Sequence, residues 1–148
     1  MAYTVQLRLL NDTSDVLYLC EQSCGEGTSW TTVPSNAPAP FGGSMYTLNL
    51  VSSGSCGMLR FKTLNGHVFA VAVGVHNYKR WCDLQVDLND RQVCTVLQQG
   101  YYKEGDPKSG VIWQQADQVS ATTKEGRKIS VKFYQNEGNR LLGVLTYV

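Results

Sequence analysis

The chain has 148 residues, with 13 basic and 12 acidic side chains and a formal net charge of +1. This length is enough for one domain with a buried core, so we predict a single domain over residues 1–148. No basic cluster extends beyond Lys79–Arg80. Composition therefore argues against a nucleic-acid groove and a polybasic membrane patch, and favours an uncharged partner.

The first residues show no charged segment followed by an apolar one, and no stretch approaches the roughly 18 apolar residues that a membrane-spanning helix needs. We therefore expect a cytosolic protein. An odd number of cysteines in a reducing compartment predicts free, mostly buried thiols. They are Cys20, Cys24, Cys56, Cys82 and Cys94.

The N-terminal part of the chain predicts short strands. Apolar and polar residues alternate from Tyr3 to Leu9, which indicates a half-buried strand. A turn is predicted over Asn11–Asp15, and further strands over Val16–Cys20 and Trp30–Val33, with the loop Glu21–Gly27 between them. Three prolines then predict a surface loop over Pro34–Gly43.

The middle of the chain predicts three more strands, Met45–Val51, Gly57–Lys62 and Val68–Val75. Asn65-Gly66 joins the last two, because this pair tolerates the positive φ angles of a tight hairpin turn. Beyond the hairpin, the apolar spacing over Leu84–Val96 is compatible with a short helix or a strand.

The C-terminal part contains a predicted loop, Tyr101–Gly110, and a possible second short helix within Val111–Ala121. Alternation predicts a strand over Lys128–Tyr134, and a turn at Glu137–Asn139 leads to a last strand over Leu141–Val148. Eight or nine short strands with regular turns predict a mainly β protein, an antiparallel β-sandwich or barrel.

The segment Gly74–Asp83, GVHNYKRWCD, is the densest in chemically active side chains. It follows the apolar run Val68–Val75, so we expect a buried strand to deliver an irregular polar segment to one edge of the domain. The hairpin also brings Ser53-Gly54 and His76-Asn77 to the same end. Together they offer a hydroxyl, a free backbone amide, an imidazole and a carboxamide, groups that suit a neutral sugar.

Simpler interpretations exist for the same residues. Ser53 and Asn77 could only cap their own turns, and His76, Tyr78 and Trp81 could be half-buried loop anchors.

Catalytic and metal sites have weaker support. Cys82 with His76 could form a thiolate nucleophile if the imidazole reached the sulfur. Two sets of possible metal ligands lack the spacing of known sites, so we expect no metal and no cofactor. These sets are Cys20, Cys24, His67 and His76 for zinc, and Asp83, Asp87, Asn89 and Asp90 for calcium.

The segment Gly74–Asp83, taken with the GMLRF strand at Gly57–Phe61, resembles the signature of the fungal fruit-body lectins, the Agaricus bisporus lectin family. Weaker matches keep the family order along most of the chain, and their first residues are Tyr3, Trp30, Ser53, Asn65, Tyr101, Gly126 and Glu137. The resemblance implies a β-sandwich of actinoporin-like shape with a short helical connection between the sheets.

The resemblance also implies a primary site for the T-antigen disaccharide, Galβ1-3GalNAc. Its Ser-Gly and His-Asn pairs match Ser53-Gly54 and His76-Asn77, and a small residue of an earlier loop falls at Gly25. On this basis we expect a lectin without catalysis, whose partners are glycans and glycoproteins that carry Galβ1-3GalNAc or N-acetylgalactosamine.

A second family site, for terminal N-acetylglucosamine, matches at Asp83 and Leu84 and then departs from the pattern. A polar residue is replaced by Val86, and the family's tyrosine by Val119. The family's arginine falls near Pro107 and Lys108, and either Lys108 or Trp113 could restore a contact. We therefore doubt that this site functions in the family's manner.

Two further expectations concern assembly and the main alternative function. Single sugar sites are usually weak, so a homo-oligomer is expected to supply avidity. The alternative is a membrane-damaging protein of actinoporin type. Such a protein needs an amphipathic N-terminal helix that inserts into the membrane, whereas residues 3–10 alternate as a strand, so we expect no membrane insertion.

Overall fold

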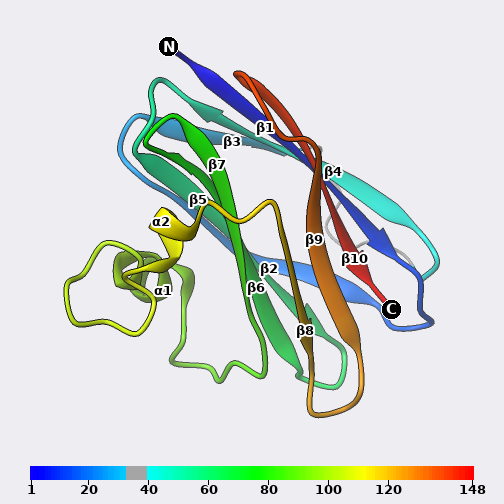
Figure 1. The fold of residues 1–148 in the computed structure, drawn as a ribbon. Helices are drawn as coiled ribbons and strands as arrows, with labels where there is room; N and C mark the ends of the chain where they lie inside the picture. The colour runs from blue at the N-terminus through cyan, green and yellow to red at the C-terminus, as the bar shows by residue number, and fades with distance from the viewer. Residues whose placement is uncertain (33–39) are drawn as a thin grey trace.

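The computed structural model describes residues 1–32 and 40–148, which form two packed β-sheets (Figure 1). The six-stranded sheet has the order β3-β4-β1-β10-β9-β8, and the four-stranded sheet has the order β2-β5-β6-β7. The strands are β1 (Tyr3–Asn11), β2 (Leu17–Cys24), β3 (Thr28–Thr32), β4 (Gly43–Leu50), β5 (Ser55–Thr63), β6 (Val68–His76), β7 (Lys79–Gln85), β8 (Gln118–Thr122), β9 (Lys128–Gln135) and β10 (Arg140–Tyr147). The mainly β sandwich predicted from the sequence is confirmed.

Strand β1 lies inside the six-stranded sheet, where it pairs with β4 in antiparallel and with β10 in parallel orientation. Its alternation is the one predicted, with Val5, Leu7 and Leu9 fully buried while Gln6 and Arg8 are exposed. The N-terminal residues are therefore a structural strand, not the amphipathic helix on which actinoporin-type insertion depends. Within the described residues, no helix is long and apolar enough to cross a membrane.

Strand β6 is covered on both faces. Its odd-numbered residues, such as Val71 and Val73, belong to the core between the sheets, where Phe69 stacks on Phe61 at 5.3 Å and on Tyr147 at 5.7 Å between ring centroids. Val68, Ala70 and Ala72 belong to a second apolar cluster on the outer face of the four-stranded sheet. Burial on both faces explains the uninterrupted apolar run of this strand.

Two short helices, α1 (Cys94–Gly100) and α2 (Val111–Gln114), cover that outer face (Figure 1). Trp81 of β7 packs against Tyr101, which directly follows α1, with 4.9 Å between ring centroids. Ile112 of α2 joins the same cluster. The short helical connection implied by the resemblance is therefore present.

The hairpin of β5 and β6 is also confirmed. The two strands pair from Ser55↔Val75 to Lys62↔Val68, and the turn between them places Gly66 at φ +86°. The start of β5 therefore lies beside the end of β6, as the sequence predicted.

The segment Gly74–Asp83 differs from the prediction. It is not irregular, because β6 continues to His76, a two-residue turn follows, and Lys79–Gln85 returns as β7. Regular pairing is possible because the outer cluster buries Trp81, and Tyr101 and Lys108 supply polar partners for the carboxylate of Asp83.

The second short helix predicted within Val111–Ala121 is present as α2, after which the chain enters β8. Two other boundaries were predicted wrongly or lie outside the described residues. Residues 21–24 belong to β2 and not to a loop. Most of the predicted loop Pro34–Gly43 lies outside the described residues, and Gly43 itself begins β4.

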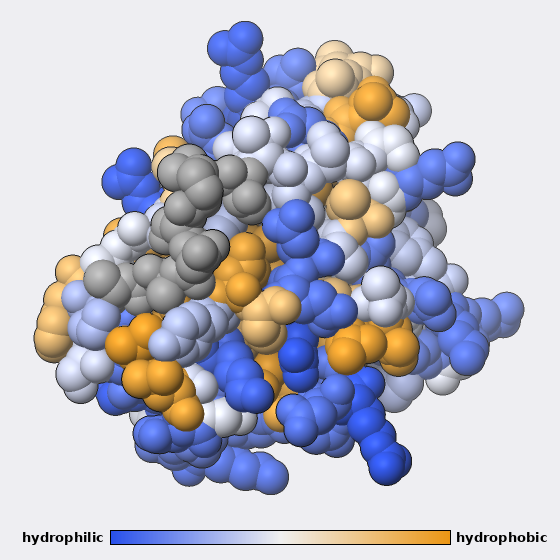
Figure 2. Space-filling view, turned by 180° about the vertical axis from the view of Figure 1, so that it is seen from behind, coloured by the Kyte–Doolittle hydropathy of each residue, from blue (hydrophilic) through white to orange (hydrophobic). Residues whose placement is uncertain are grey.

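The far side of the molecule shows hydrophobic residues in several separate groups between polar ones (Figure 2). All five cysteines are free thiols, of which Cys56, Cys82 and Cys94 are buried and Cys20 and Cys24 are exposed. The prediction of free thiols that are mostly buried is therefore confirmed.

Candidate functional site

The loop that contains Ser53 and Gly54 is attached to the β6–β7 turn by two hydrogen bonds. The backbone N–H of Tyr78 donates to Ser53 Oγ at 3.0 Å, and the backbone N–H of Gly54 donates to the carbonyl of Val75 at 2.8 Å. The structure thus brings Ser53-Gly54 and His76-Asn77 together at one edge of the four-stranded sheet. Their role in binding a ligand stays a prediction.

The bond made by Gly54 corrects one detail of the sequence analysis. Its backbone amide is not free for a ligand, because it already pairs with the Val75 carbonyl. Gly54 has φ +100°, and a Cβ built on it would meet no described atom within 4 Å. The glycine therefore contributes a left-handed backbone and an open surface that a flat sugar face can approach closely.

The β6–β7 turn is a two-residue hairpin loop in which both residues have positive φ, 50° for Asn77 and 67° for Tyr78. Such loops follow the twist of the flanking strands, and asparagine tolerates this conformation better than most residues. Asn77 is exposed, and its carboxamide makes no hydrogen bond to any described residue. Its donors and acceptor are therefore available to a ligand.

His76 lies on the outer face of the sheet, next to the α2 residue Trp113. The two rings meet edge to face at 4.3 Å between centroids, and Trp113 is 64% exposed. Both imidazole nitrogens are buried without a hydrogen-bond partner among the described residues. A ligand hydroxyl that displaces the exposed indole would satisfy them, and an unpaired buried polar group costs about 1–3 kcal/mol.

Gly25 lies at the same edge, in the turn between β2 and β3. Its backbone N–H donates to the carbonyl of Cys56 at 2.9 Å, and a Cβ at this position would lie only 2.1 Å from Ser55 Oγ. A larger residue here would therefore require the Ser55 hydroxyl to rotate away. Whether Gly25 touches a sugar stays a prediction.

A depression of about 540 Å³ lies beside this edge. Its walls include Ser53 and Gly54, and one side is formed by Tyr102, the residue after the buried Tyr101. The sequence analysis overlooked Tyr102, and it considered Trp113 only for the second sugar site. The adjacent pair Tyr101-Tyr102 was the available signal, and the structure buries Tyr101 while Tyr102 stays 46% exposed.

The candidate second site is already occupied by protein contacts. Asp83 Oδ2 accepts a hydrogen bond from the Tyr101 hydroxyl at 2.8 Å and lies 2.9 Å from Lys108 Nζ. Leu84 points to the opposite face, into the core between the sheets. Lys108 thus reaches Asp83, as the sequence analysis allowed, whereas Trp113 contacts His76 instead.

The substituted positions of this second site pack against the core. Val86 and Val119 are both partly buried there, so neither presents a polar group to a ligand. The structure therefore brings only Asp83 and Lys108 together on the surface that the second site would use.

The thiolate interpretation is not compatible with the fold. Cys82 faces the core between the sheets, whereas His76 faces the outer side of the same sheet. Burial raises the pKa of Cys82 to about 12, and its thiol is directed at the carbonyl of Ala116. A thiolate stabilised by His76 cannot form in this arrangement.

The proposed metal ligands do not come together in the structure. The described residues contain no group of three or more histidine, cysteine or acidic side chains that could hold a metal ion. His67, one of the residues considered for zinc, is half exposed and pairs with Glu125 at 2.5 Å.

Comparison with known proteins identifies the family to which the chain is similar. Residues 1–145 match the family described as fungal fruit body lectin. The chain is 38% identical to Boletus edulis lectin over 96 residues, which are 65% of this chain and 66% of that protein. The match thus spans slightly less than two thirds of this relative.

Solved structures show the same fold. Wild-type Xerocomus chrysenteron lectin is 28% identical, with a TM-score of 0.88 and 100% of both chains covered. A crystallised variant of that lectin gives a TM-score of 0.89 at 29% identity, covering 100% of this chain and 99% of that one. The lipid binding protein Nakanori shares the fold alone, with a TM-score of 0.69 at 10% identity over 98% of this chain and 70% of that one.

Proposed function

The chain belongs to the fungal fruit body lectin family, and we propose that it binds glycans carrying Galβ1-3GalNAc or N-acetylgalactosamine at Ser53, Gly54, His76 and Asn77, without catalysis. The observation that carries the proposal is the hydrogen bond from Tyr78 N–H to Ser53 Oγ, which fixes the Ser-Gly loop against the His-Asn turn. Two residue pairs that are distant in sequence thereby come together at one surface.

Each group at this surface has a role in recognising a neutral disaccharide. Ser53 Oγ accepts a bond from the backbone, so its own O–H remains free to donate to a sugar hydroxyl. The carboxamide of Asn77 can both donate and accept, as neighbouring hydroxyls require. Gly54 leaves room for the apolar face of the ring, and the imidazole of His76 gains the partners that it lacks.

Assembly and location are part of the same proposal. We propose a homo-oligomer, because several weak sites on one particle give the avidity that agglutination needs. We also propose a cytosolic location, because the five cysteines are free thiols, which a reducing compartment preserves.

The test is a calorimetric titration of Galβ1-3GalNAc into the wild-type protein and into Asn77→Gly. Glycine keeps the positive φ of the turn and removes only the carboxamide, whereas alanine would also strain the backbone. Loss of one or two paired contacts is expected to weaken binding roughly 5- to 150-fold.

The matched control is Asn65→Gly, the same change in the turn at the other end of the β5–β6 hairpin. It should leave the affinity unchanged. Equal affinities of wild-type and folded Asn77→Gly protein would remove Asn77 from the site. Absence of any binding by the wild-type protein would refute the proposed specificity.

A further inference from the structure

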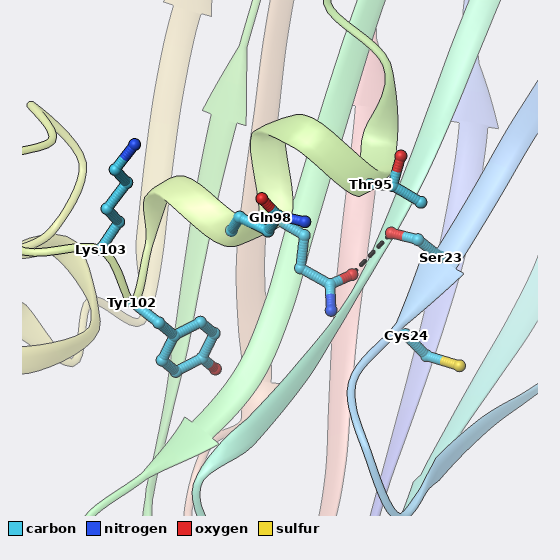
Figure 3. A pocket seen from close by; sticks show the side chains of 7 residues that line it. Ser23, Cys24, Thr95, Gln98, Tyr102 and Lys103 are labelled. Atoms are coloured by element: carbon cyan, nitrogen blue, oxygen red, sulfur yellow. Dashed lines mark hydrogen bonds between the residues drawn. The ribbon is translucent and has the colours of Figure 1, made fainter.

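A second depression, of about 510 Å³, lies between the end of β2 and the helix α1 (Figure 3). Its walls include Ser23, Thr95, Gln98 and Tyr102. Tyr102 also forms a wall of the depression beside Ser53 and Gly54. The two depressions therefore adjoin at this tyrosine, and they do not involve the surface around Asp83.

The ring of Tyr102 is held in place by the buried residue before it in the chain and by a buried neighbour in space. The preceding residue, Tyr101, is fully buried under Trp81. The Tyr102 phenol also lies beside the thiol of the buried Cys56, and burial raises the pKa of this phenol. The residue nevertheless stays 46% exposed. An anchored, half-exposed ring is a surface on which the apolar face of a sugar can stack.

The other residues of this depression offer hydrogen-bonding groups that no described residue uses. The Ser23 hydroxyl donates to Gln98 Oε1 at 2.6 Å, which fixes the carboxamide and leaves its two N–H donors unused by any described residue (Figure 3). The hydroxyl of Thr95 likewise makes no hydrogen bond within the described part of the chain. Lys103 also lines this depression, and its side chain extends away from Tyr102 in the view of Figure 3.

We propose that this second depression is an extension subsite, in which a glycan bound at Ser53 and Gly54 continues across Tyr102 and places its next neutral sugar unit on the Gln98 carboxamide. The inference rests on the proposed function, because it takes the disaccharide site as its starting point. It predicts a preference for glycans longer than the disaccharide, with Tyr102 and Gln98 as specificity-determining residues.

The test compares Galβ1-3GalNAc with trisaccharides that carry one further neutral sugar on the galactose or on the N-acetylgalactosamine. For at least one of them, stacking and one or two hydrogen bonds should tighten binding to the wild-type protein roughly 3- to 30-fold. Gln98→Leu keeps the volume of the side chain and should remove most of this gain. It should leave the disaccharide affinity unchanged, since Gln98 lines only the second depression.

Tyr102→Ala should abolish the gain as well, and Tyr18→Ala serves as its matched control. Tyr18 is 38% exposed and lies near the opposite end of β2 from Ser23. Saturation-transfer NMR on the wild-type protein gives a readout that needs no variant, because protons of the third sugar should receive magnetisation from the protein.

The outcomes separate the two proposals. If the disaccharide binds but no trisaccharide binds more tightly and its third sugar receives no saturation, the extension subsite is refuted while the proposed function stands. If the disaccharide does not bind at all, both are refuted. Retention of the full gain by folded Gln98→Leu and Tyr102→Ala proteins would also overturn the subsite.

Discussion

Terminal N-acetylglucosamine is expected to bind beside Asp83 far more weakly than Galβ1-3GalNAc binds at the proposed site, or not at all, because the second site has lost more than about a hundredfold of the affinity that its complete set of contacts would give. The structure gives the reason. Asp83 Oδ2 is already engaged by the Tyr101 hydroxyl and the Lys108 ammonium, and a sugar hydroxyl would have to displace one of them. Val86 and Val119 pack against the core and offer no hydrogen bond.

The magnitude follows from three lost contacts. Val86 and Val119 each replace a family residue that could pair with or stack on the sugar, and Lys108 offers a point charge instead of the fork of an arginine. Each unpaired polar contact costs about 1–3 kcal/mol. Three losses at the low end already amount to about 3 kcal/mol, which corresponds to more than a hundredfold in affinity.

The assay is a calorimetric titration of free N-acetylglucosamine into the Asn77→Gly protein, in which the proposed primary site is disabled. Galβ1-3GalNAc titrated into the wild-type protein gives the reference affinity. A saturable signal that disappears in an Asn77→Gly, Asp83→Asn double variant would show that the second site functions and that the substitutions were misjudged. Asparagine is used at position 83 because it keeps the shape of the aspartate and one acceptor for Tyr101.

Three other results are expected. Asp15 accepts hydrogen bonds from Tyr147 and Arg127, which lower its pKa, so its contribution to the free energy of unfolding is present above about pH 4 and is lost as the pH falls through the lower pKa of the folded state. Denaturant titrations should therefore show that Asp15→Asn destabilises the protein at pH 7 and less at pH 2, and an equal loss at both would contradict this. EDTA should leave agglutination unchanged, whereas a loss that calcium or zinc reverses would reveal a metal site. Iodoacetamide should leave Cys82 unmodified in the folded protein, because burial raises the pKa of this thiol to about 12; loss of disaccharide binding that tracks alkylation of Cys82 would argue otherwise.

Local sequence patterns predicted the strands that have one polar and one apolar face. In β1 and β9 every second residue enters the core between the sheets, so alternation alone locates these strands. The hairpin of β5 and β6 was predictable for a related reason, since Asn65-Gly66 separates two apolar runs by a tight turn. Pairing in that hairpin then places Ser53-Gly54 beside His76-Asn77.

Strands β7 and β8 were missed because their burial depends on distant parts of the chain. In β7 the outward-facing Trp81 and Asp83 look like surface residues until the α1–α2 connection covers them. In β8 the inward-facing Val119 and Ala121 are only partly buried, so the periodic signal is weak. The contributions of Tyr102 and Trp113 could not be predicted for the same reason, since both come from that connection.

The register of β6 and β7 connects the stability of the core to the geometry of the proposed site. Val71, Val73 and Val75 face the core, and this alternation directs His76 to the outer face, where it meets Trp113. A slip by one residue would turn His76 inward and replace the three valines in the core with Ala70, Ala72 and Gly74, which would leave cavities between the sheets and overpack the outer cluster, at a total cost of several kcal/mol. That cost is comparable to the whole stability of a domain of this size, which is typically about 5–15 kcal/mol. The core therefore fixes which side of the sheet His76 faces, and the side chains at the end of the hairpin can change without altering the direction in which they point.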